Sequence, residues 1–307
     1  MLEEVRSTPV RHLIIGGTIK GATTSVFDYL SAHPEVCGSS VKETFFFTQH
    51  YSGKREQDIK NYRKYFSESF GSKVWVEASP NYLAFKRKVA PCIHSLLPDA
   101  RMLFILRNPV DRFYSHYNFA RGKLELPENI TFEQYFELCQ QYSCGNLTVE
   151  QAGIAEKHLR ALEIGNYAKY LYNYFEILPR ANIRVVFFED LKADPVLFMV
   201  GICKYAGIHP SFFSNYEFKQ SNVTYSARFK PLHFIVIRLN RMLESTLRQH
   251  PQVKTKLVAL YKKFNQNEQG YKRMEGETRR RVSQYYKPYN TELKILLESK
   301  NVPSWLD

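Results

Sequence analysis

Short apolar runs alternate along this chain with segments in which apolar residues recur at helical spacing. Four runs predict strands, at residues 13–15, 73–78, 101–106 and 183–188. The run at 101–106 is continuously apolar, which is typical of a parallel strand covered on both faces. Because the strands alternate with helical segments, we predict an α/β fold, with a central, mostly parallel sheet of four or five strands and helices on both faces.

The segments between these strands are predicted to form helices, a turn and a loop-like region. Residues 33–36 are interpreted as a turn, and residues 121–150, which contain Pro127 and Gly145, as loop-like. A chain of 307 residues with 44% apolar content can form one large α/β domain or two small ones, and we expect a single domain over residues 1–307. The predicted helices cover residues 23–30, 62–66, 86–98, 110–117, 155–162, 167–175 and 195–205.

No apolar run approaches the roughly 20 residues that span a bilayer, so we expect no membrane span. Residues 1–6 lack the basic and apolar regions of a signal peptide. The sequence therefore predicts a cytoplasmic protein, or a protein whose N-terminal anchor has been removed.

The chain is strongly basic, with 43 Lys and Arg against 30 Asp and Glu and a net charge of +13. Such a charge suits a polyanionic substrate, an anionic cofactor, nucleic acid or a membrane surface, and it also occurs on an ordinary solvated surface. The basic residues are spread out, and no zinc-finger, RRM or basic-zipper pattern occurs. We therefore expect no nucleic-acid partner.

The segment between the first strand and the first helix is suited to an anion. Backbone N–H groups converge where a helix begins, and the helix dipole adds partial positive charge. Thr23 or Thr24 can cap the helix. The order differs from a Walker A loop, because Lys20 precedes Gly21 instead of following it. The residues predicted to hold a phosphate-like group are Lys20, Gly21, Ala22, Thr23, Thr24 and Ser25.

A second candidate anion site follows the strongest strand. Arg107 stands at the end of this strand and Ser115 lies eight residues further on, in the next predicted helix. The planar guanidinium fork and the hydroxyl together suit a phosphate monoester.

A candidate general base precedes the aromatic run at residues 45–47. Burial of this run would place Glu43 at the edge of an apolar region, where a carboxylate becomes more basic. The alternative is a surface ion pair with Lys42. His50 and His116 are the nearest competing bases.

Glu77, Ser79 and Tyr82 stand at the carboxyl end of a predicted strand, where open α/β sheets bind ligands. Equally, Glu77 and Ser79 could only hydrogen-bond neighbouring backbone.

These segments, in order, resemble sulfotransferases that use 3′-phosphoadenosine 5′-phosphosulfate (PAPS). Lys-Gly-x-Thr-Thr-Ser at residues 20–25 resembles their phosphosulfate loop, although Ala22 stands where the family usually has Gly. Lys-Glu-x-x-Phe-Phe at residues 42–47 resembles the heparan-type carbohydrate sulfotransferases, whose Glu at this place is the catalytic base. Leu-Arg-Asn-Pro-x-x-Arg-x-x-Ser-x-Tyr at residues 106–117 resembles the 3′-phosphate motif of the same family.

The resemblance implies a P-loop-like sulfotransferase fold and transfer of a sulfuryl group from PAPS to an acceptor hydroxyl or amine, with adenosine 3′,5′-bisphosphate (PAP) as product and no metal. Lys20 and Glu43 would be catalytic, and Arg107, Ser115 and Arg228 would bind the donor with the first loop. Arg228 is carried over from an Asn…Ser-x-Arg segment that resembles bacterial relatives, because the Lys-Gly-Arg of heparan-type members is absent.

The acceptor predicted is a carbohydrate, with a small-molecule natural product as the alternative. Its pocket would include Lys42, Glu77, Tyr82 and His50, with residues 121–150 as a variable insertion nearby. An anchored form would lie in the Golgi lumen. A P-loop-like kinase and a basic polyanion-binding module stay open as other classes, and the sequence leaves the oligomeric state undetermined.

Overall fold

The computed structural model describes residues 10–67, 71–85, 87–219, 273–298 and 302–306, and short pieces between 226 and 267. The chain forms two compact units. The first comprises residues 1–112, 166–222 and 286–307, and the second comprises residues 113–165 and 223–285. Two helices, α4 (Pro109–Gly122) and α14 (Gly276–Leu297), continue from one unit into the other.

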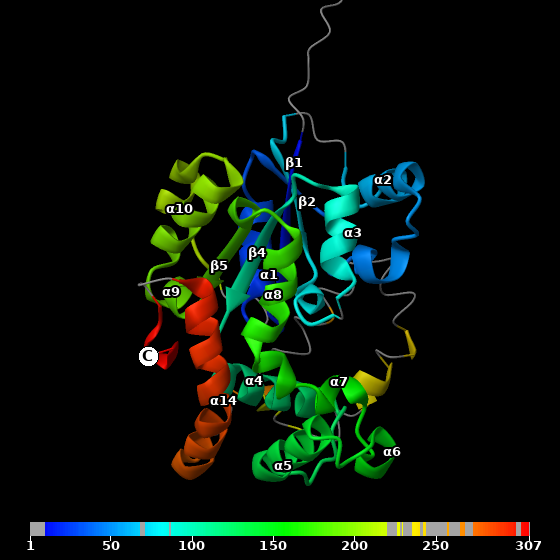
Figure 1. Ribbon diagram of the computed structural model, residues 1–307, viewed down its shortest axis with the longest axis vertical. Coiled ribbons are helices and arrows are strands. Elements are labelled where there is room, and N and C mark those ends of the chain that lie inside the picture. Colours follow the sequence, from blue (N-terminus) through cyan, green and yellow to red (C-terminus); the bar gives the residue numbers. More distant parts are fainter. Residues whose placement is uncertain are drawn as a thin grey trace, which may run out of the picture. The chain divides into compact units, whose positions relative to one another are not determined.

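The first unit is built on a five-stranded, all-parallel sheet (Figure 1). This confirms the predicted α/β fold with a parallel sheet. The order is β2–β3–β1–β4–β5, so β1 lies at the centre between β3 and β4. The prediction missed β2 and interpreted its beginning as a turn, because a strand of three residues is too short to show a period. The strands are β1 (Arg11–Gly17), β2 (Val36–Gly38), β3 (Val74–Ala78), β4 (Arg101–Leu106) and β5 (Ile183–Phe187).

Each central strand is apolar on both faces because the sheet is covered on both. Leu103 and Ile105 of β4 belong to one buried core, whereas Met102, Phe104 and Leu106 belong to the other. This alternation with a period of two is hidden in a continuous apolar run.

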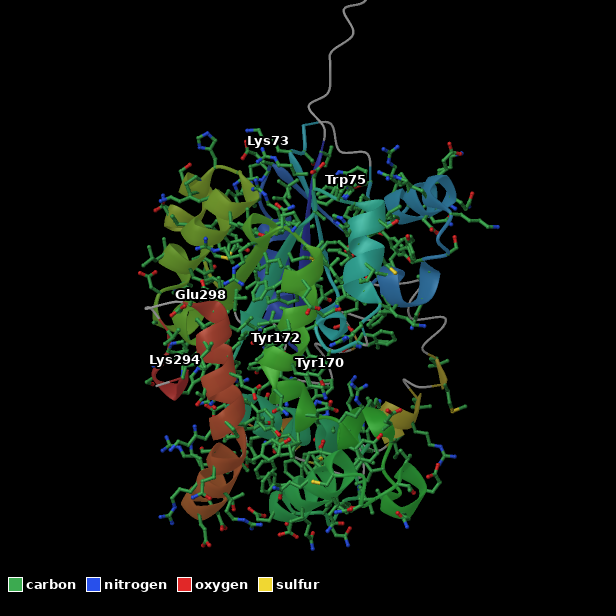
Figure 2. All side chains as sticks on the ribbon, in the orientation of Figure 1. Lys73, Trp75, Tyr170, Tyr172, Lys294 and Glu298 are labelled. Atoms are coloured by element: carbon green, nitrogen blue, oxygen red, sulfur yellow. The ribbon has the colours of Figure 1, made fainter. Side chains whose placement is uncertain are left out.

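Helices cover the two faces in separate groups (Figure 1). The core on one face includes residues of α1 (Thr23–Ser31), α9 (Phe188–Ala193) and α10 (Pro195–Ala206). The core on the other face includes residues of α2 (Arg55–Arg63), α3 (Val89–Leu96), α8 (Tyr167–Ile177) and the last turns of α14. On α8, Tyr170 packs against the core while Tyr172 is exposed (Figure 2). The helix predicted at residues 62–66 was placed too late in the sequence, because α2 begins at Arg55 and ends at Arg63.

The second unit is mainly helical and contains α5 (Phe132–Ser143), α6 (Val149–Ala152) and α7 (Glu156–Leu159). It also contains a short antiparallel pair, β6 (Ser226–Ala227) and β7 (Gln266–Asn267). The loop-like interpretation of residues 121–150 is wrong for residues 132–143. Thr131 and Gln134 form a capping box at the start of α5, a signal that was readable in the sequence as Thr-x-x-Gln.

Within the described part of the chain, no helix is long and apolar enough to cross a membrane.

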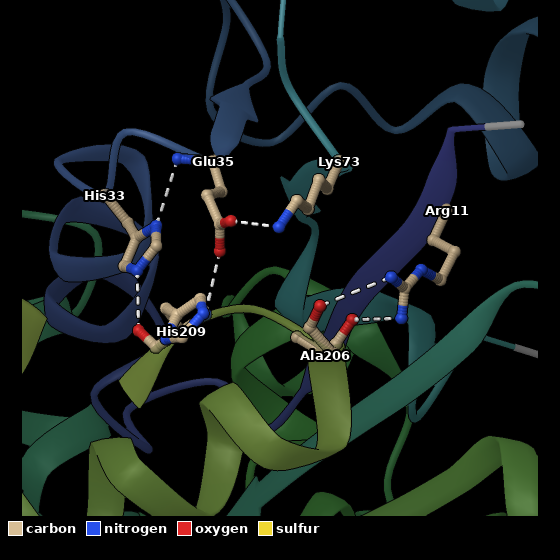
Figure 3. A network of polar contacts seen from close by, with 7 residues as sticks. Arg11, His33, Glu35, Lys73, Ala206 and His209 are labelled. Carbon is tan, nitrogen blue, oxygen red and sulfur yellow. Dashed lines mark hydrogen bonds and ion pairs between the residues drawn. The ribbon is translucent and has the colours of Figure 1, made fainter. Parts of the chain in front are cut away.

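A polar network closes the end of the sheet where the strands begin (Figure 3). Glu35, just before β2, pairs with Lys73, just before β3, and accepts a hydrogen bond from the backbone N–H of His209 at 2.8 Å. The Nε2 of His33 lies 2.9 Å from the His209 carbonyl, and its Nδ1 accepts from the Glu35 N–H. Lys73 marks this end of the sheet in Figure 2. The network thus ties the loops before two strands to the segment that follows α10.

Replacing Glu35 by Gln should lower the melting temperature at neutral pH and have little effect near pH 3. The hydrogen bonds from Lys73 and from the His209 N–H hold the pKa of Glu35 below its ordinary value of 4.5. Its contribution is therefore present above that pH and is lost as the pH falls through the folded-state pKa. Because the ion pair is partly exposed, we expect at most about 1 kcal/mol.

Thermal unfolding of the wild type and Glu35→Gln between about pH 7 and pH 3 measures this difference. A difference that stays constant across the range would show that the charge of Glu35 is not responsible.

Candidate active site

The segments predicted to carry chemistry in the first unit lie at the carboxyl ends of three neighbouring strands, β3, β1 and β4. Lys20 follows β1, Arg107 follows β4, and the loop that carries Glu43 is held at the end of β3 by a hydrogen bond from the Glu43 N–H to Ala78 O at 3.0 Å. Since these strands are hydrogen-bonded neighbours, three segments far apart in sequence share one edge of the sheet.

The connections that follow β1 and β4 lead to opposite edges of the sheet, towards β2 and towards β5. From β1 the chain leads into α1, whose core lies on one face. From β4 it returns, after the second unit, to α8, whose core lies on the opposite face. Open α/β sheets bind ligands at such a switch point, because the two connections diverge there.

The loop after β1 is pressed against the end of β4. The Thr18 N–H donates to Ile105 O at 3.0 Å, and the Gly21 N–H donates to Thr18 O at 2.9 Å. A Cβ atom on Gly21 would lie 2.5 Å from Ile105 O and 3.0 Å from Thr18 O. The loop follows the strand end so closely that only glycine fits at this position.

Helix α1 begins without a side-chain cap, so the expectation that Thr23 or Thr24 caps it is wrong. Its N-cap is Ala22, in the left-handed conformation with φ 66°, and alanine has no side chain that can accept a hydrogen bond. No side chain of the N-cap residue therefore occupies the N-terminus of α1, where the helix dipole favours an anion. The left-handed φ explains why glycine is usual at this place in the family that the loop resembles.

The side chains of this loop differ in exposure. Lys20 and Thr24 are half-buried, whereas Thr23 and Ser25 are buried. The hydroxyl of Thr18 is buried and has no hydrogen-bond partner among the described residues. Because buried polar atoms are normally hydrogen-bonded, this atom is expected to find its partner in a bound ligand or water.

Arg107 contacts the loop after β1 directly. Its Nη1 donates to the Lys20 carbonyl at 3.2 Å, and its guanidinium lies 4.8 Å from the ring centre of Phe188. Burial lowers the pKa of Arg107, opposed by the nearby Asp111, Tyr167 and Glu189. A partly desolvated guanidinium binds an anion more strongly than one in water.

Two side chains that the sequence did not single out for function support the turn at Arg107. The Tyr167 hydroxyl donates to Arg107 O at 2.7 Å, and the Asn108 N–H donates to Glu189 Oε1 at 2.9 Å. Burial raises the pKa of Tyr167 to about 12, so it stays a neutral donor. The hydrogen bond from the Asn108 N–H gives Glu189, which follows β5, a structural role at this turn.

Two other predicted donor-binding residues lie elsewhere. Ser115 is in α4, in the second unit, so its pairing with Arg107 stays a prediction. Arg228 lies outside the described residues.

Glu43 is more exposed than the aromatic run after it suggested. Its side chain is 43% exposed and pairs with Lys42 Nζ at 3.0 Å, whereas Phe46 and Phe47 are buried. The expectation of an apolar surrounding is therefore wrong. Glu43 has φ 65° and Phe45 φ 51°, so both adopt the left-handed conformation that costs about 1–2 kcal/mol for an L-residue. Neighbouring contacts must hold this loop.

Glu77 is fully buried and lies beneath the Glu43 loop. Its carboxylate accepts hydrogen bonds from the hydroxyls of Thr44, Tyr62, Ser79 and Tyr82. Burial raises the pKa of Glu77 to about 7, against the lowering effect of these hydrogen bonds. These partners are side chains and not the neighbouring backbone that the simpler interpretation had expected.

The residues predicted for the acceptor pocket separate in the structure. Glu77 and Tyr82 are both fully buried, whereas Lys42 is half-buried and His50 is exposed, on the π-helical turn η1 (Phe46–His50). Only Lys42 and His50 therefore offer accessible side chains here.

Comparison with known proteins decides the family. Residues 11–287 match the sulfotransferase domain family. This chain belongs to the sulfotransferase family. Its matched region includes the three motifs that pointed to this family in the sequence.

Several curated sulfotransferases are similar to parts of the chain. A membrane-associated sulfotransferase, kil1 of Dictyostelium discoideum, is 30% identical over 152 residues, which cover 50% of this chain and 30% of the relative. Heparan sulfate glucosamine 3-O-sulfotransferase 3A1 of Mus musculus is 26% identical over 199 residues, covering 64% of this chain and 45% of the relative. This sulfotransferase chain thus spans less than half of the length of both relatives.

A solved structure supports the fold. The sulfotransferase from Alicyclobacillus acidocaldarius superimposes with a TM-score of 0.64 at 20% identity, covering 98% of this chain and all of that one. The likeness extends over both units of this sulfotransferase.

Substitutions at two adjacent residues of the loop after β1 should change the free energy of unfolding in opposite directions. In Gly21→Ala the new methyl group meets backbone, and such overpacking costs about 1–3 kcal/mol. In Ala22→Gly a left-handed residue is relieved, so we expect a change between zero and about 1 kcal/mol of stabilisation. Thermal unfolding of both variants checks this, and a Gly21→Ala variant as stable as the wild type would contradict the tight loop.

Proposed function

We propose that this sulfotransferase transfers a sulfuryl group from PAPS to a hydroxyl or amine of a carbohydrate. One observation carries the proposal within the family. The start of α1 and the guanidinium of Arg107 lie at the carboxyl ends of β1 and β4, where Arg107 donates to the carbonyl of Lys20, two residues before the N-cap Ala22. This arrangement supplies two groups of anion donors, as a donor with separate phosphate groups requires.

PAPS supplies an activated sulfuryl group: the bond between sulfur and the 5′-phosphate oxygen breaks as a bond forms from sulfur to the acceptor oxygen or nitrogen, and PAP leaves. The residues then have distinct tasks. Lys20 neutralises the charge that develops on the 5′-phosphate, with the amides at the start of α1. Arg107 binds the 3′-phosphate, together with Ser115 and Arg228. Glu43 takes the proton that the acceptor loses.

The acceptor proposed is an acidic carbohydrate. Several relatives act on heparan sulfate by name, and the net charge of +13 favours a polyanionic partner. Lys42 and His50 are exposed enough to contact such an acceptor near Glu43. A small-molecule acceptor is the alternative.

Glu43→Gln tests the reaction itself. The amide keeps the shape and removes the base, so sulfation should fall by about 10²–10⁴-fold while PAP binding is retained. The measurement is sulfate transfer from radiolabelled PAPS to N-desulfated heparin, heparan sulfate and a set of simple phenols. Calorimetric titration with PAP serves as the control for the donor site.

If the wild type transfers sulfate to none of these acceptors and does not bind PAP, the proposed function is wrong. If Glu43→Gln stays fully active while His50→Asn is inactive, the base is a histidine, and the acceptor prediction moves to a small molecule.

Arg107→Ala should weaken PAP binding by about 10- to 100-fold, the equivalent of about 1.5–3 kcal/mol for hydrogen bonds to a charged group. Adenosine 5′-phosphosulfate lacks the 3′-phosphate, so its affinity should change much less. Arg180→Ala is the matched control, because Arg180 lies just before β5, at the end of the sheet where the strands begin, whereas Arg107 follows the carboxyl end of β4. Equal losses for both ligands would refute the assignment of the 3′-phosphate to Arg107.

A further inference from the structure

The loop of the proposed base is anchored to the end of β3 at several consecutive backbone groups. Besides the bond from the Glu43 N–H to Ala78 O, the N–H groups of the next residues donate to hydroxyl oxygens. The Phe45 N–H donates to Ser79 Oγ at 3.3 Å and the Phe46 N–H to Thr44 Oγ1 at 3.2 Å. The Phe47 N–H donates to the Tyr82 hydroxyl at 3.3 Å.

Each of these three hydroxyls in turn donates to Glu77. Thr44 forms the closest hydrogen bond, to Oε2, and Ser79 reaches the same oxygen at 3.4 Å. Tyr82 reaches Oε1 at 3.5 Å, as Tyr62 does at 3.4 Å. The longer contacts are weak, so Thr44 is the principal link between the carboxylate and the loop.

An ionised carboxylate only accepts hydrogen bonds. It therefore attracts the protons of all three hydroxyls, and each hydroxyl oxygen is left to accept from a backbone N–H. These contacts hold the loop in which Glu43 and Phe45 keep positive φ angles, a conformation that persists only when its surroundings enforce it.

We propose that Glu77 is a positioning residue of the sulfuryl transfer, which holds the Glu43 carboxylate in place through Thr44, Ser79 and Tyr82. The inference rests on the proposed function, because there Glu43 is the base. Glu77 has no exposed surface, so it acts through the loop and not by touching the acceptor.

Protonation of Glu77 should loosen the loop. A carboxylic acid must donate one hydrogen bond, so one hydroxyl has to turn its own proton away from Glu77. The hydroxyls of Thr44 and Tyr82 lie 3.4 Å apart, which offers a second arrangement. The titratable groups that face the carboxylate are Tyr62, Tyr65 and Tyr82, whose pKa values are all raised, mainly by burial. They stay neutral while Glu77 titrates near pH 7.

Stability and activity should then depend on pH in opposite directions. Folding raises the pKa of Glu77 from 4.5 to about 7, so the folded state binds the extra proton and its stability falls as the pH rises across that range. Turnover, which needs the ionised carboxylate, should rise over the upper part of the same range.

Glu77→Gln and Thr44→Val test the proposal, with Glu35→Gln, at the other end of the sheet, as the matched control. We expect Glu77→Gln to lower kcat about 10- to 100-fold above pH 7 with little change in KM for PAPS, the loss typical of a small misplacement. Thr44→Val should act in the same direction. Glu35→Gln should leave kcat unchanged.

Two further measurements separate positioning from general stability. The rise of kcat through about pH 7 should be absent in Glu77→Gln, and the melting temperature of the wild type should fall relative to this variant as the pH rises. Amide hydrogen exchange in residues 45–47 should be faster in both variants and unchanged in Glu35→Gln. This exchange readout does not depend on the acceptor.

The outcomes are distinguishable. A wild type that neither transfers sulfate nor binds PAP refutes the proposed function. An active wild type, an inactive Glu43→Gln and a Glu77→Gln with normal kcat, pH profile and exchange refute the positioning role alone. If Glu77→Gln does not fold, Thr44→Val decides, because it keeps the carboxylate in place.

Discussion

The close fit of the loop after β1 against the end of β4 is the constraint on which the donor site depends. Gly21 leaves no space for a Cβ atom beside Ile105 O, and Arg107 reaches the Lys20 carbonyl only because the loop follows the strand end. Tyr167 and Glu189 then fix the turn from the other side. The position of the groups proposed to bind phosphate is therefore set by the sheet, which two buried cores cover on its two faces.

Both loops of the candidate site contain strained residues. Lys20 and Ala22, in the loop after β1, have positive φ angles, and so do Glu43 and Phe45 in the loop held at the end of β3. The left-handed conformation costs about 1–2 kcal/mol for each residue. Such residues persist where the surrounding structure determines their conformation, and they are common at active sites. Here the carboxyl ends of β3 and β4 provide that support through backbone and hydroxyl hydrogen bonds. The stability of the sheet thus holds these four candidate site residues in unfavourable backbone conformations.

Two carboxylates a short distance apart along this edge have different environments. Glu43 is exposed beside Lys42, which leaves its carboxylate accessible to solvent. Glu77 is enclosed by hydroxyl groups, where burial raises its pKa towards neutrality. A group that contacts the acceptor must be accessible, whereas a group that fixes a loop gains from exclusion of water, because its hydrogen bonds strengthen in a low dielectric. The roles proposed for Glu43 and Glu77 match this difference in burial.

The sequence by itself determined the α/β class, the strand ends that carry Lys20 and Arg107, and the family, because apolar strands and local motifs are encoded in consecutive residues. It did not determine β2 or α5, where a strand was too short and a capping signal was outweighed by Pro127 and Gly145. Only the tertiary structure decided that Glu43 is exposed, that Glu77 is buried, and that Thr44 links the two segments. Those properties depend on which residues pack above a strand end, and no local pattern specifies such long-range contacts.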